Sequence, residues 1–184
     1  MEVVLNVMKS EKYNFLFSIN TSFLILFTED NGLIGEIPLE LSKLTHLTRL
    51  DMSSNKLTGE ISSTMFPKNI ATINLSENNL TGSIPNQIYD LASLESLHLS
   101  TNELTGSLSI AIGKLMALKE LHLEQNRFTG EVPIQLGQLP SLSVIYLQVN
   151  SFVGAIPNKL CGNDGKIWAD CVEEIQCTCC ERCF

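Results

Sequence analysis

Two histidines of this 184-residue chain are spaced so that they could bind a metal ion together. His98 and His122 are separated by an interval that recurs along the chain, and Glu120 and Glu124 lie on either side of His122. If one interval makes one coil of the fold, the two imidazoles come side by side about 5 Å apart, and imidazoles with a carboxylate are a common zinc ligand set. The competing interpretation, which we favour, is a pair of solvated imidazoles on an open surface. The sequence therefore predicts no metal and no cofactor.

Catalytic motifs are missing from the sequence. It contains no G-x-S-x-G, no H-E-x-x-H and no phosphate-binding glycine loop, and no cysteine nucleophile precedes Cys161. The third histidine, His46, is expected on a solvated turn. We therefore predict that the protein is not an enzyme.

The cysteines are all concentrated at the carboxy-terminal end, from Cys161 onward. An even number of cysteines at this density indicates disulfides formed in an oxidising compartment, and six cysteines allow 15 pairings. The alternative is zinc, because two C-x-x-C pairs are present, but they overlap in one residue, Cys180, and would form a poor tetrahedral site. A thioredoxin-like role lacks the βαβ context that it needs. We predict a disulfide-closed cap over residues 161–184, made by Cys161, Cys171, Cys177, Cys179, Cys180 and Cys183.

The charge balance excludes one class of partner. The chain has 12 Lys+Arg against 20 Asp+Glu, a net charge of −8, whereas a nucleic-acid surface needs the opposite balance. With 44% hydrophobic residues it is also too apolar for a disordered acidic tail. We expect a folded protein that does not bind nucleic acid.

A regular repeat organises the rest of the chain and must position the side chains discussed above. Each repeat has an Asn, apolar residues at −8, −5 and −3 before it, a Leu or Phe at +2 and a Gly at +4. This L-x-x-L-x-L-x-x-N pattern predicts stacked coils, each with a short strand of a parallel sheet, centred near Leu50, Ile73, Leu97, Leu121 and Ile145. The Asn amides should satisfy buried backbone groups after each strand. The predicted ladder is Asn31, Asn55, Asn78, Asn102, Asn126 and Asn150.

The segment Asn78-Asn79-Leu80-Thr81-Gly82-Ser83-Ile84-Pro85 resembles the plant-type leucine-rich repeat, N-x-L-T-G-x-I-P. The resemblance implies an α/β solenoid, a right-handed superhelix of about six 24-residue coils over residues 23–160, with a parallel concave β-sheet. It also implies a second extended ladder made by the L-T-G-x-I-P segments, and short helical turns on the convex side. The third coil, with Pro67, is one residue short and should be the most irregular.

The two ends depart from the repeat. Residues 1–22 carry no repeat register and are expected to be an atypical or truncated amino-terminal cap; a weak signal peptide is the alternative. The apolar stretch 15–27 is too short for a membrane span. The cysteine pair that usually caps plant-type arrays here is missing, which suggests a fragment of a larger receptor. The other end resembles the cap of leucine-rich repeat proteins from diatoms. Trp168 is expected to cover the apolar edge of the sixth coil, and a ligand-stacking role is the alternative.

The outward positions of the predicted strands are candidates for binding. A rigid sheet lowers the ordering cost of association, so repeat solenoids use such concave surfaces for partners. The resemblance implies a non-enzymatic extracellular or cell-surface module, a receptor-like ectodomain or a secreted inhibitor, that binds a protein, peptide or polysaccharide. The alternatives are a structural or adhesive surface protein, a partner surface on the lateral edge, and a metal protein. The candidate binding residues are Arg49, Asp51, Asn74, His98, Glu120, His122, Glu124 and Tyr146.

Three N-x-S/T sequons predict glycosylation, at Asn20, Asn74 and Asn79. A glycan on Asn79 should be accessible, whereas one on Asn74 would obstruct the concave face.

Overall fold

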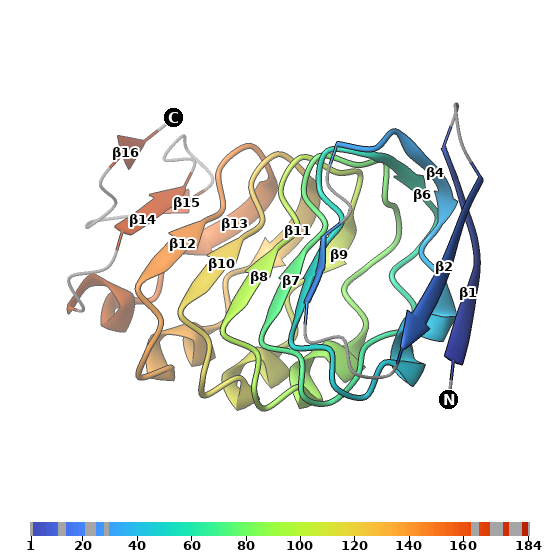
Figure 1. Cartoon of the computed structure of the whole chain (residues 1–184). Helices are drawn as coiled ribbons and strands as arrows, with labels where there is room; N and C mark the ends of the chain where they lie inside the picture. Colours follow the sequence, from blue (N-terminus) through green and yellow to red (C-terminus); the bar gives the residue numbers. More distant parts are fainter. Residues whose placement is uncertain are drawn as a thin grey trace.

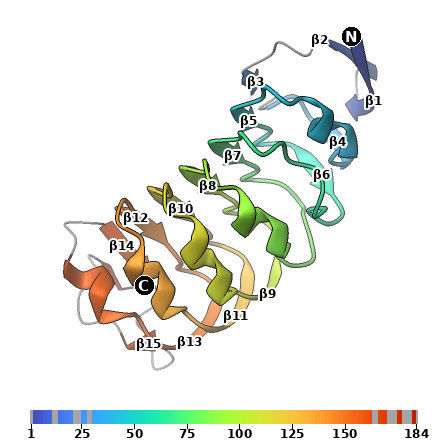
Figure 2. The ribbon, with the colours of Figure 1, turned by 90° about the horizontal axis from the view of Figure 1, so that it is seen from below.

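The computed structural model describes residues 2–10, 14–20, 25–27, 30–162, 166–169, 175–176 and 182–183, with their side chains over 30–160 and 166–169. The chain winds into coils that stack from the amino-terminal hairpin to the carboxy-terminal strands, with the large sheet along one side (Figure 1). Seen from below, successive coils lie side by side in sequence order (Figure 2). The repeat period therefore corresponds to one turn of a solenoid.

One strand from each coil enters an eight-stranded parallel sheet, whose outer surface we call the concave face. Rows of equivalent residues pair in register, so that Leu50, Ile73 and Leu97 stand side by side. The predicted strand centres are confirmed. In spatial order the strands are β3 (Ile25–Phe27), β5 (Arg49–Asp51), β7 (Thr72–Asn74), β8 (Ser96–His98), β10 (Glu120–His122), β12 (Val144–Tyr146), β14 (Lys166–Ala169) and β16 (Arg182–Cys183).

The expected second ladder is also present, built by the L-T-G-x-I-P segments. β4 (Leu33–Glu36) pairs with β6 (Lys56–Thr58). In the later coils β9 (Thr105–Ser107), β11 (Arg127–Glu131), β13 (Ser151–Ala155) and β15 (Ile175–Gln176) form one sheet. Between these two groups a bridge from Glu60 to Thr81 continues the parallel pairing.

Short 3-10 helices form the convex side. They are η1 (Leu39–Lys43), η2 (Asn86–Asp90), η3 (Ile110–Lys114), η4 (Ile134–Gln138) and η5 (Asn158–Gly162). Where Ser109 replaces the usual proline, its hydroxyl accepts a hydrogen bond from the Ala111 amide and caps η3. The coil between β6 and β7 has turns but no such helix, and Ile70 donates to the Pro67 carbonyl. The predicted irregularity of this short coil is confirmed.

The inward leucines form a continuous core that runs from coil to coil. Leu50, Leu97 and Leu121 are fully buried, and burying one such side chain contributes about 1.5–3 kcal/mol. Each coil alone has only short strands and a turn, so its apolar side is covered only by its neighbours.

Asn side chains hold the bend that follows each strand. The Asn102 carbonyl oxygen accepts from the Leu80 amide at 3.0 Å, and its amide nitrogen donates to the carbonyls of Leu75 and Leu99. Equivalent bonds join Asn126 to Leu104 and Leu99. Each Asn thus ties two coils together through backbone groups that would otherwise be buried without partners.

The amino-terminal segment forms a hairpin, which the sequence did not predict. β1 (Glu2–Ser10) pairs antiparallel with β2 (Asn14–Asn20), and the end of β1 pairs with β4 at Ser10 and Leu33. The hairpin lies at the end of the stack (Figure 1). It therefore covers an edge of the second ladder that would otherwise be open.

The predicted cysteine cap lies largely outside the described residues. Cys171, Cys177, Cys179 and Cys180 fall there entirely, and Cys161 and Cys183 are described without their side chains. Disulfides, with zinc as their alternative, therefore remain predictions.

Candidate functional site

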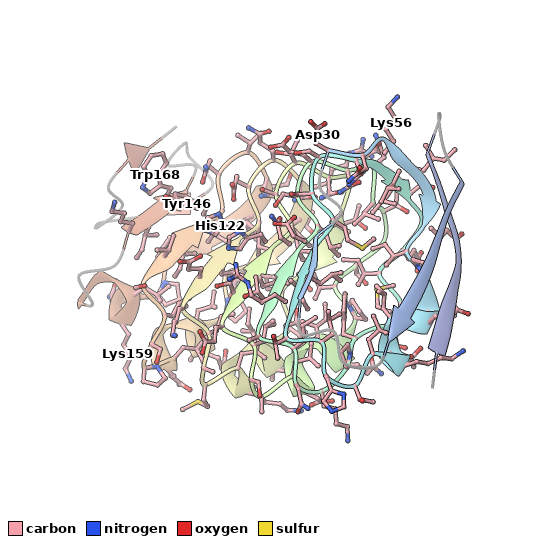
Figure 3. The ribbon with its side chains drawn as sticks, viewed as in Figure 1. Asp30, Lys56, His122, Tyr146, Lys159 and Trp168 are labelled. Carbon is pink, nitrogen blue, oxygen red and sulfur yellow. The ribbon has the colours of Figure 1, made fainter. Side chains whose placement is uncertain are left out.

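The concave face carries a row of four rings, one from each of four neighbouring strands. His98, His122, Tyr146 and Trp168 pair in register on β8, β10, β12 and β14. The imidazoles of His98 and His122 stack with centroids 4.1 Å apart, and the contacts from His122 to Tyr146 and from Tyr146 to Trp168 are edge-to-face at 4.6 and 5.1 Å. Figure 3 shows His122, Tyr146 and Trp168 following one another along the face. We call these four side chains the ring row.

Trp168 lies in a position that differs from the favoured prediction. Instead of covering the apolar edge of the last coil, it extends the ring row beyond Tyr146 and is half-buried. Its neighbours Ile167 and Ala169 point inward and are buried, because side chains alternate along β14. Counted from His122 and Tyr146, the repeat would place the next outward side chain at position 170 rather than 168, which explains why the repeat spacing did not reveal Trp168.

The two histidines are more enclosed than solvated imidazoles on an open sheet would be. Their side chains are 24% and 21% exposed. Burial, and to a smaller extent the charge of His98, lowers the pKa of His122 from its ordinary value of 6.5 to about 4, while Glu120 acts in the opposite direction. At neutral pH the His122 ring is therefore uncharged and one of its nitrogens carries a free lone pair.

Carboxylates flank the ring row. Glu120 Oε2 lies 3.1 Å from His98 Nε2, and ring nitrogens of both histidines and this carboxylate all come within 4.8 Å of one another. Glu124 lies on the other side, with Oε1 4.0 Å from His122 Nδ1. Burial raises the pKa of Glu124, against hydrogen bonds from its backbone and from Ser100. The structure thus brings His98, Glu120, His122, Glu124 and Tyr146 into one cluster.

Several polar atoms of this cluster are buried without a hydrogen-bond partner among the residues described. They are His122 Nε2, Glu124 Oε2 and, from a residue not proposed on sequence grounds, Gln148 Oε1. Gln148 lies beside Glu124 one coil further on, at an outward position of the repeat. Buried polar groups normally have hydrogen-bond partners, so these atoms mark a surface where a ligand could supply the missing hydrogen bonds.

The remaining candidates form a separate, purely polar part of the face. Asn74 donates to Asp51 at 2.9 Å, and its own carbonyl oxygen accepts from the Ser76 amide. Arg49 is exposed at the edge of this part. Of the predicted glycosylation sites, the structure describes the side chains of Asn74 and Asn79. The amide of Asn74 is engaged in hydrogen bonds in the folded chain, whereas the side chain of Asn79 is exposed. The side chain of Asn20 lies outside the described residues.

A stack of repeated coils with a parallel sheet on one side and short 3-10 helices on the other defines a repeat solenoid. The chain belongs to the leucine-rich repeat family. Models of the leucine rich repeat match residues 45–104 and 117–139.

The curated proteins that the chain matches include a plant receptor-like kinase and plant receptor-like proteins. The chain is 39% identical to Receptor-like protein 35 of Arabidopsis thaliana over 78 residues, which cover 41% of this chain and 8% of that protein. The solved leucine-rich repeat ectodomain of the Arabidopsis thaliana membrane receptor kinase GASSHO1/SCHENGEN3 is 32% identical with a TM-score of 0.74, covering 80% of this chain and 18% of that one. The plant peptide hormone receptor RGFR1 is 30% identical with a TM-score of 0.69, covering 83% and 28%.

The chain spans less than a tenth of the length of the curated relatives that it matches. Among the residues described, none of the helices has the length and apolar character needed to cross a membrane.

Proposed function

We propose that this chain is a non-enzymatic recognition module that binds a protein or peptide partner on its concave face, outside the cell or at its surface. The observation that carries the proposal is the ring row, half-buried and bordered by polar atoms without partners among the described residues. Aromatic side chains on a rigid sheet lose little conformational entropy on binding and serve as anchors. The partner that fits is an extended segment with apolar side chains for the rings and hydrogen-bond donors for Glu124 and Gln148.

The relatives support a partner of this kind. GASSHO1/SCHENGEN3 was solved in complex with CASPARIAN STRIP INTEGRITY FACTOR 2, and RGFR1, a peptide hormone receptor, with RGF2. On the same ground we propose that the chain works as a receptor-like ectodomain or as a secreted recognition protein. Disulfides in the carboxy-terminal segment and a glycan on Asn79 would fit that location.

The test is capture of partners from native extracellular fluid on the immobilised chain. Tyr146→Ala removes the ring between His122 and Trp168, and Glu120→Lys reverses a charge on a side chain that is 42% exposed. Both should abolish capture of a component that the wild type retains. Glu120→Lys should keep an unfolding temperature close to the wild type's, and Tyr146→Ala should still unfold in one cooperative transition. Mass spectrometry and sugar analysis of that component distinguish a protein from a polysaccharide.

The matched control is Ile110→Ala, because Ile110 is 71% exposed on η3, on the convex side. Capture should be unchanged in this variant. Retention of the partner by both concave-face variants, with loss in Glu60→Lys on the lateral edge, would contradict the proposal and move the binding surface to the second ladder.

A further inference from the structure

The geometry points to a binding site for a divalent transition-metal ion, of the zinc class, formed by His98, Glu120 and His122 on the concave face. Each residue offers one ligand atom, and these atoms all lie within 4.8 Å of one another. The residues come from two adjacent strands, β8 and β10, whose pairing fixes His98 opposite His122. The site goes beyond the proposed function, since a partner could bind the concave face without any metal.

Two of the three ligand atoms are already at a suitable separation. Ligands about 2.0–2.1 Å from a tetrahedral zinc ion stand about 3.3 Å from each other. His98 Nε2 and Glu120 Oε2 are 3.1 Å apart, so an ion could replace the hydrogen bond between them with little movement. The stacked rings, at 14° to each other, must open by rotation of the His122 ring, because a metal lies in the plane of each imidazole that binds it.

The third ligand atom belongs to His122. Metal ions bind an imidazole through the lone pair of a ring nitrogen. The His122 Nε2 is buried with no hydrogen-bond partner in the described part of the chain. Coordination would satisfy this atom, which nothing in the ring row does.

The ligand set also fits the class of ion. Two histidines and one glutamate are three of the four ligands of a tetrahedral zinc site that keeps one position open. That position would be filled by water or by a donor atom of a bound partner. Imidazole nitrogens favour zinc, cobalt, nickel and copper over magnesium and calcium, which prefer oxygen ligands.

The test is titration of the full chain with Co²⁺ and Zn²⁺ without any partner. Cobalt is the spectroscopic probe, because thiolate ligands give an intense charge-transfer absorption that histidine and glutamate do not. We expect one equivalent of cobalt bound with visible absorption, and displacement of that cobalt by zinc. His98→Phe and His122→Phe keep a ring at each position but remove the ligand nitrogen, and each should weaken binding at least tenfold.

Glu120→Gln, which keeps the shape but removes the charge, should weaken binding to a lesser extent. His46→Ala is the matched control, since His46 is exposed on a convex turn, and should bind as the wild type does. Unchanged affinity in both Phe variants, or bound cobalt with only thiolate charge-transfer absorption, would overturn the inference and assign the metal to the cysteines. Neither result would affect partner capture, so the two proposals fail independently.

Discussion

The ladder Asn residues combine burial with several hydrogen bonds each, and Asn102 gives the clearest single test. Asn102→Ala would orphan the Leu80 amide and remove donors to Leu75 and Leu99. We expect a loss of roughly 1–3 kcal/mol in the free energy of unfolding, measured by chemical denaturation. Asn79→Ala, at an exposed position one residue past another ladder Asn, should change it by no more than about 0.5 kcal/mol. Equally small losses in the two variants would mean that the Asn ladder contributes nothing to the free energy of unfolding.

The buried His122 ring predicts how stability depends on pH. Its pKa is about 4 in the folded chain and 6.5 ordinarily, so between these values the unfolded chain binds a proton that the folded chain does not. The free energy of unfolding should therefore fall as the pH is lowered through this window, by roughly 1–3 kcal/mol in total from this group.

Denaturation in chelator-treated buffer at several pH values measures this effect. His122→Phe should lose less stability than the wild type between pH 6.5 and 4. Parallel curves for wild type and His122→Phe would show that the ring is not buried in its neutral form.

At this scale the sequence predicted much of the site and missed part of it. Equal spacing placed His98 and His122 side by side, because one repeat equals one coil. It could not predict that the rings are stacked and half-buried, since that depends on Tyr146 and Trp168 closing in from the neighbouring coils. Periodicity fixes the strand position of a residue but not its exposure.

Among the elements, the second ladder depends on a glycine in every coil. Gly106 has φ +83° and Gly35 has φ +89°, both in the left-handed region where a side chain costs about 1–2 kcal/mol. A Cβ on Gly106 would also lie 3.1 Å from the Ser83 Cβ in the preceding coil, whereas one on Gly35 meets nothing within 4 Å.

Gly106→Ala should therefore lower the free energy of unfolding more than Gly35→Ala does, because the Ser83 Cβ is fixed to its backbone and cannot rotate away. Chemical denaturation measures the free energy of unfolding of the two variants. The comparison is a matched one, because both variants carry the same substitution in the same backbone conformation. An identical loss in both would show that the spacing between coils can relax to accept a side chain.

The elements that the sequence predicted are those that repeat. Five strand centres and the irregular third coil follow from comparing one copy with the next, whereas the second ladder was implied by the resemblance to the plant-type repeat. The amino-terminal hairpin and β14 occur once, and without a second copy the pattern of apolar residues could not place them. The hairpin also depends on a distant pairing with β4, which local sequence does not encode.

For the molecule as a whole, the cysteines predict an oxidised carboxy-terminal end. A protein with all six cysteines in disulfides should have a mass lower by about six hydrogens than the reduced chain, measured by mass spectrometry without reductant. Reduction should then unfold the last coils before the rest, because repeat arrays lose structure from an end that lacks its cap. Thiols that react in the unreduced native protein, or zinc bound in proportion to them, would contradict this prediction.

The register of the ring row sets a scale for anything that binds along it. Neighbouring strands of a sheet are about 4.8 Å apart, so the four rings follow one another at regular intervals of about this length. An extended peptide laid across the strands advances about 3.3 Å per residue, so three of its residues span nearly the same distance as two coils. Because successive side chains of an extended chain point to opposite faces, a ligand side chain that faces the sheet would meet an equivalent position again only after about six residues, or about four coils. The row runs from imidazole to phenol to indole, so its two ends are chemically different. A peptide bound with its amino terminus at the imidazole end would therefore make different contacts from one bound in the opposite direction.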